Sequence, residues 1–102
     1  MADSQKILTP AEIADAALPD WQQDGESLTA GFATGDFATG LELVNRIGAS
    51  AEAANHHPDL TLTYPEVTVT LTSHDVGGIT RRDIELARAI SEHASQLDLT
   101  GS

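Results

Sequence analysis

The sequence contains no cysteine, and aromatic residues make up only 4% of its 102 residues. Without cysteine the chain can form no disulfide, no thiolate metal site and no thiol nucleophile. Any catalysis must therefore rest on histidine, carboxylate or hydroxyl groups. Hydrophobic residues still make up 40% of the chain, so the core must consist mainly of Leu, Ile, Val and Ala.

Basic residues are also scarce, since 5 Lys and Arg stand against 16 Asp and Glu and give a formal net charge of −11. A field of this sign repels phosphate backbones and anionic lipid, so we expect neither nucleic-acid nor membrane partners. No apolar run approaches the roughly 20 residues that span a bilayer, and residues 1–9 are polar. We therefore expect a soluble, cytoplasmic protein.

The length of the chain suits one compact domain over residues 1–102. A domain of this size buries a limited fraction of its surface, so association with further copies of itself would stabilise it. We therefore expect a homo-oligomer.

The first half of the chain carries signals for two helices and two strands. Thr9, Pro10 and Glu12 form a helix start with a capping box, which predicts a helix over residues 10–18. Residues 21–23 and 27–32 read as two strands around an Asp-Gly turn. A second helix begins after Asp36, with apolar residues spaced along one face, and ends before Pro58. The predicted face of this helix consists of Phe37, Leu41, Val44, Ile47, Ala51 and Ala54.

Residues 60–73 alternate strictly between apolar residues and threonine, as a half-buried hairpin does. Pairing Leu60 with Leu71 and Tyr64 with Val67 matches apolar to apolar throughout, and it places Tyr64 on the apolar face. Continued to the preceding residues, this register brings His57 opposite His74. Because Pro-Glu is poor for a two-residue turn, a slip of two residues is the alternative.

A last helix is predicted after Thr80, which is a good N-cap residue. The order of elements is then helix, two strands, helix, two strands, helix. Two hairpins that are each followed by a helix favour an α+β domain of two layers. We expect a four-stranded antiparallel sheet with three helices on one face.

Three of the four histidines, His56, His57 and His74, come together in this folding scheme. Imidazole is the side chain best suited to proton transfer near neutral pH. A helix end followed by an extended residue would let His56 and His57 face one cleft. Carboxylates lie nearby in the sequence, and a carboxylate that binds an imidazole fixes its tautomer. These are Glu52, one turn before His56, and Asp59 and Asp75 in the flanking loops.

Several readings compete with a catalytic one. Histidines at a surface or a helix end are common, and three histidines could also bind zinc, although adjacent ligands are geometrically awkward. Asp83 stands at the third helical position after Thr80, where it caps the helix first and serves a site second. Trp21 suits a core or interface position. His93 lies outside the cluster, where we expect it to be solvated.

The motifs around the histidines resemble those of the pterin-4a-carbinolamine dehydratase family. Residues 52–59 read Glu-Ala-Ala-Asn-His-His-Pro-Asp, and residues 72–80 read Thr-Ser-His-Asp-Val-Gly-Gly-Ile-Thr. Tyr64 stands between these two segments and Asp83 follows them. Such a long ordered pattern is specific, and weaker similarity extends back to Trp21 and Phe32.

The resemblance implies an α+β fold that assembles as homodimers or homotetramers. The implied activity is a hydro-lyase reaction, the dehydration of 4a-hydroxytetrahydropterin to quinonoid dihydropterin in tetrahydrobiopterin recycling, without a metal or organic cofactor. His56 and His74 would act as acid and base, and His57 would orient the pterin. The residues that would bind or surround the substrate are Trp21, Glu52, Asp59, Asp75 and Asp83.

The alternative function on the same fold is non-catalytic. Members of this family also serve as a dimerisation cofactor of a transcription factor or as assembly-factor-like paralogs. The three histidines favour the enzyme, because an assembly module requires only its surface.

Overall fold

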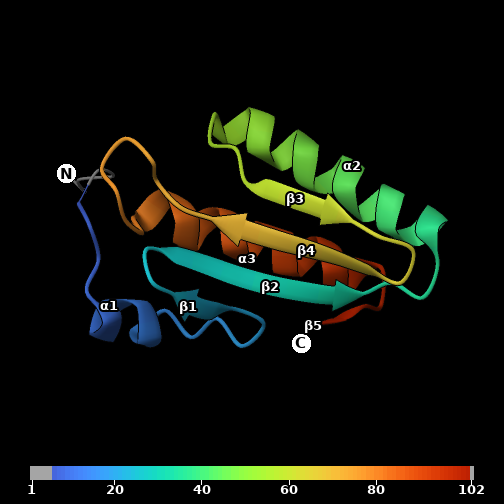
Figure 1. Ribbon diagram of the computed structural model, residues 1–102, viewed down its shortest axis with the longest axis horizontal. Helices are drawn as coiled ribbons and strands as arrows, with labels where there is room; N and C mark the ends of the chain where they lie inside the picture. Colours follow the sequence, from blue (N-terminus) through green and yellow to red (C-terminus); the bar gives the residue numbers. More distant parts are fainter. Residues whose placement is uncertain (1–5, 102) are drawn as a thin grey trace.

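The computed structural model describes residues 6–101, which form three helices and five strands (Figure 1). The elements follow the chain as α1 (Pro10–Asp15), β1 (Gln22–Asp24), β2 (Ser27–Ala33), α2 (Phe37–Ala54), β3 (Asp59–Leu62), β4 (Glu66–Leu71), α3 (Arg81–Gln96) and β5 (Thr100–Gly101). This order confirms the predicted α+β architecture, and the two-residue β5 is an addition that no sequence pattern indicated.

All paired strands run antiparallel, in the order β1-β2-β4-β3, and β5 pairs with the end of β2. The side chains of β2 and β4 alternate, so that one face of the sheet is buried. Helix α3 runs behind β2 and β4 with α2 beside it, and α1 lies at the β1 end (Figure 1). The core between these layers includes Leu28, Phe32, Val67, Val69, Leu71, Leu43, Ile47, Ala87 and Ile90.

The helix starts follow the predicted caps. Thr9 and Glu12 form a capping box at α1, Asp36 accepts a hydrogen bond from the Thr39 backbone at α2, and Thr80 caps α3. Helix α1 ends at Asp15, before the predicted position 18, because Ala17 takes a left-handed conformation with φ of 54°.

The predicted buried face of α2 is wrong in its first two turns and at Ala54, which is exposed. Phe37 and Leu41 are exposed, and Gly40 and Leu43 face the core instead. A Cβ atom on Gly40 would lie 2.7 Å from a methyl group of Leu62, so only glycine allows α2 to approach the β3–β4 hairpin this closely. The hydrophobic pattern did not reveal this face because glycine adds no apolar side chain to it.

The hairpin does not take the first predicted register but the alternative one, slipped by two residues. Leu62 pairs with Val67 and Leu60 with Val69, and the turn is closed by a 2.9 Å hydrogen bond from the Thr63 amide to the Glu66 carbonyl. Both registers match apolar to apolar, because strand faces repeat every two residues, so the turn decides between them. Tyr64 therefore sits at the hairpin tip with 68% of its surface exposed, contrary to its predicted packing.

No helix within residues 6–101 combines the length and the apolar character that crossing a membrane requires.

Candidate active site

The end of α2 turns His56 into the protein. Asn55 caps the helix in a left-handed conformation with φ of 52°, and the His56 amide donates to the Ala51 carbonyl at 3.1 Å. This reversal places the imidazole of His56 against the start of α3, with 9% of the residue exposed. His56 thus lies beyond the helix end and before β3, which begins at Asp59.

The imidazole of His56 is hydrogen-bonded to the buried carboxylate of Asp83. Nε2 of His56 lies 2.5 Å from Oδ1 of Asp83, whose residue is fully buried. The other oxygen of Asp83, Oδ2, accepts hydrogen bonds from the Ser73 hydroxyl at 2.8 Å and from the Thr80 amide at 2.9 Å. Asp83 is therefore the helix cap that was predicted, and with its other oxygen it also holds a histidine.

Two buried hydroxyl groups extend this network. Oγ of Ser73 and Oγ1 of Thr80 lie 2.8 Å apart, and both residues are fully buried. Oγ1 of Thr80 also accepts from the Arg82 amide at 3.2 Å. Ser73 was not predicted as a site residue, and its one sequence signal is its place directly before His74.

His57 lies on the surface and has a different carboxylate partner. Its Nε2 is hydrogen-bonded to Oε2 of Glu52, and both side chains are more than half exposed. Glu52 was expected beside His56, one helical turn away, but the reversal at Asn55 brings it to His57 instead.

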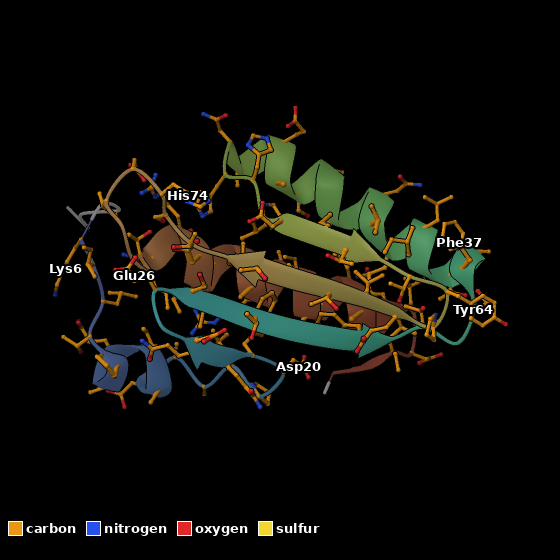
Figure 2. The ribbon with its side chains drawn as sticks, viewed as in Figure 1. Lys6, Asp20, Glu26, Phe37, Tyr64 and His74 are labelled. Carbon is orange, nitrogen blue, oxygen red and sulfur yellow. The ribbon has the colours of Figure 1, made fainter. Side chains whose placement is uncertain are left out.

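His74 lies in the loop between β4 and α3, at the end of the molecule opposite Phe37 and Tyr64 (Figure 2). Its side chain is exposed and has no hydrogen bond to any residue within 6–101. The next residue, Asp75, accepts a 2.8 Å hydrogen bond from Arg82, and this bond lowers the pKa of the Asp75 carboxyl. The structure therefore does not pair His57 with His74 in the way the predicted register implied.

A cavity of about 450 Å³ opens between the end of α2 and the start of α3. Its apolar walls come mainly from alanine and leucine, and its ionisable side chains are His56, Arg82 and Glu85. The complete lining consists of Ser50, Ala53, Ala54, His56, Arg82, Glu85, Leu86 and Ala89. His56 is thus the one predicted catalytic histidine in this lining.

Trp21 does not line this cavity. Its indole donates a 2.9 Å hydrogen bond to Ser91, two helical turns beyond Asp83 on α3, and its ring meets that of Phe32 edge to face at 6.3 Å. It lines a separate hollow beside α1. Asp59 is the exposed first residue of β3.

His93 is half-buried, contrary to its predicted solvation. Its Nε2 lies 2.6 Å from the Ser50 hydroxyl of α2, while its Nδ1 is the one buried side-chain polar atom without a hydrogen-bond partner in the described part of the chain. This contact depends on how α2 packs against α3, which the sequence does not show.

The chemistry available in the cavity is proton transfer. A neutral imidazole whose one nitrogen binds a carboxylate presents its other nitrogen as a base, or as an acid once protonated. Within residues 6–101 no three His, Asp or Glu side chains gather in an arrangement that could hold a metal ion.

The family model described as pterin 4 alpha carbinolamine dehydratase matches residues 6–93. A protein of Thermosynechococcus vestitus, named as an inferred pterin-4-alpha-carbinolamine dehydratase, is 49% identical over 89 residues, which cover 85% of this chain and 94% of that protein. A protein of Halobacterium salinarum with the same name is 40% identical over 76 residues, which cover 74% of this chain and 84% of that one.

Solved structures share the fold. A transcriptional coactivator/pterin dehydratase from Brucella melitensis is 34% identical and superposes with a TM-score of 0.83 over 87% of this chain and 99% of that one. A pterin dehydratase-like protein described as a RuBisCO assembly factor in the alpha-carboxysome is 23% identical, with a TM-score of 0.51 over 76% of this chain and 84% of that one, and this likeness concerns the fold alone. By its sequence and its fold, this chain belongs to the pterin-4a-carbinolamine dehydratase family.

Proposed function

We propose that this chain is a hydro-lyase that dehydrates 4a-hydroxytetrahydropterin to quinonoid dihydropterin, in tetrahydrobiopterin recycling, by histidine acid/base catalysis. The observation that carries the proposal is the buried pair of His56 and Asp83 at the wall of a 450 Å³ cavity. Burying an ionisable pair costs free energy of desolvation, which a purely structural role does not require. Family membership gives the substrate class.

The reaction is an elimination that two imidazoles can perform. A base removes the proton from a ring nitrogen of the pterin, the electron pair of that bond forms the C=N double bond, and the C4a–O bond breaks. An acid protonates the departing hydroxyl, which leaves as water. His56 and His74 supply these two groups and His57 orients the pterin, with Glu52 holding His57 and Asp83 holding His56.

The cavity suits a flat bicyclic ring with polar edges. Its alanine and leucine walls can contact the ring faces, while the charged groups of Arg82 and Glu85 stand where polar ring atoms need partners. The volume falls within the roughly 300 to 1,000 Å³ of small-molecule sites. Asp75 supports this wall through its hydrogen bond to Arg82.

The test measures the rate of 4a-hydroxytetrahydropterin dehydration with purified protein against the spontaneous rate in the same buffer. We expect a faster reaction with protein, and losses of activity in His57→Ala and His74→Ala. A rate equal to that of buffer would exclude the enzyme. If the protein instead co-purified with a stable protein partner and had no pterin turnover, the assembly function would hold.

A further inference from the structure

We infer that Ser73 is a positioning residue which, through Asp83, holds His56 in the tautomer that presents an unprotonated Nδ1 to the cavity, so that His56 is the base of the reaction. The tautomer and the role of Ser73 follow from the geometry of the network. The role as base rests on the proposed function.

The two nitrogens of His56 have different surroundings. Nε2 is taken by Oδ1 of Asp83 at 2.5 Å. Nδ1 makes no hydrogen bond within residues 6–101, yet it is not among the fully buried polar atoms that lack a partner. Because His56 also lines the cavity, Nδ1 is the nitrogen that a bound molecule can reach.

The contact with Asp83 determines which nitrogen of His56 carries the proton. A carboxylate accepts hydrogen bonds and donates none, so Nε2 must carry the proton that points to Asp83. In the neutral ring Nδ1 then has a free electron pair. It takes the proton from the pterin nitrogen, and the resulting imidazolium is stabilised by the charge of Asp83. The proton leaves to solvent after water and product depart, which restores the neutral ring.

Asp83 is itself held in place by neighbouring groups. Its Oδ2 is held by two donors, the Ser73 hydroxyl at 2.8 Å and the Thr80 amide at 2.9 Å. The Thr80 hydroxyl lies 2.8 Å from Oγ of Ser73 and can donate to it, which leaves the Ser73 proton for Asp83. Ser73 thus fixes the carboxylate from inside the protein, although it does not line the cavity.

The direct test of the tautomer is nuclear magnetic resonance of the histidine nitrogens in the protein without substrate, recorded where the spectrum is that of the neutral ring. We expect the proton of His56 on Nε2 in the wild type. A proton on Nδ1 would overturn the inference. This measurement needs neither a variant nor turnover, so its outcome is independent of the proposed function.

The variant Asp83→Asn should reverse the tautomer of His56. Two donors point at the position of Oδ2, so the amide oxygen takes that place and the NH2 group faces Nε2 of His56. Nε2 must then accept, and the proton moves to Nδ1. We expect this change in the nitrogen spectrum together with a loss of about 10² to 10⁴-fold in kcat, as for a lost base. An unchanged tautomer would contradict the proposed geometry.

Ser73 is tested by its own pair of variants. Ser73→Ala should lower kcat by about 10-fold or more with KM changed less than about two-fold, because an orienting partner is lost while the cavity wall is intact. Ser73→Thr, which keeps the hydroxyl, should restore kcat. The control Thr72→Val removes the neighbouring hydroxyl, which donates to the Glu26 carbonyl instead, and should leave kcat unchanged. Full activity in Ser73→Ala would refute the positioning role.

Discussion

Replacing Asp83 by alanine should be among the most destabilising single changes in this chain. The carboxylate is fully buried and accepts three hydrogen bonds, from His56 at 2.5 Å, from Ser73 at 2.8 Å and from the Thr80 amide at 2.9 Å. Asp83→Ala removes all three together and leaves the histidine without its partner. It also removes half of the capping box of α3.

The magnitude follows from these contacts. Hydrogen bonds to charged groups contribute about 1.5 to 3 kcal/mol each, but Ser73 keeps its contact with Thr80, so the three do not add in full. Two full contributions of this size amount to about 3 to 6 kcal/mol, and we take about 3 to 5 kcal/mol as the expected loss. For a domain of this size, each kcal/mol lowers Tm by roughly 4 to 8 °C. A loss of 3 kcal/mol would therefore lower Tm by roughly 12 °C or more.

The assay is chemical unfolding followed by circular dichroism, at fixed protein concentration. The control is Glu85→Ala on the same helix, which removes an exposed ion pair with Arg81 and should cost about 0.5 kcal/mol or less. If Asp83→Ala lost less than about 1 kcal/mol, the buried network would not exist as described, because a satisfied buried carboxylate cannot be removed at so little cost.

Three further predictions concern the rest of the fold. Phe32→Ala should lower the free energy of unfolding by about 3 to 5 kcal/mol, since Phe32 is fully buried in the core, and a loss near zero in chemical unfolding would contradict that packing. Tyr64→Ala should change it by less than about 0.5 kcal/mol, because the side chain stands exposed at the hairpin tip; a larger loss would favour the register with Tyr64 on the buried face. Asp75→Asn should destabilise the protein fully above about pH 3.9 and progressively less below it, because Arg82 lowers the folded pKa of Asp75 and the contribution of the carboxylate disappears as the pH falls through that folded pKa. An unfolding midpoint difference that grew toward acid pH would refute this.

The elements and their caps could be predicted from the sequence because the signals are local. A capping box such as Thr80 with Asp83 and the alternation of residues 60–71 each lie within a few residues of chain. The register of that hairpin could not be predicted from the sequence. A slip of two residues still pairs apolar residues with apolar residues, so only the turn distinguishes the two registers. The buried face of α2 was predicted wrongly for a related reason. Gly40 allows α2 to approach the β3–β4 hairpin closely, but it adds no apolar side chain to the pattern.

The candidate site was predicted in part. The motif around His56 and the cap at Asp83 were visible in the sequence, but the contact between them spans 27 residues and depends on the reversal at Asn55. Ser73 was missed because one buried serine looks like any other in a strand-to-loop segment. Trp21 was expected at the pocket wall, whereas its indole packs against Phe32 and Ser91.

The most direct test of the central claim is kcat for 4a-hydroxytetrahydropterin dehydration in His56→Ala, compared with the wild type and with Tyr64→Ala. We expect His56→Ala to lose about 10²-fold or more, as for a lost proton-transfer group. Tyr64→Ala, whose change lies at the end of the molecule opposite His74, should retain full activity. Equal kcat in His56→Ala and wild type, with both proteins folded, would contradict the account.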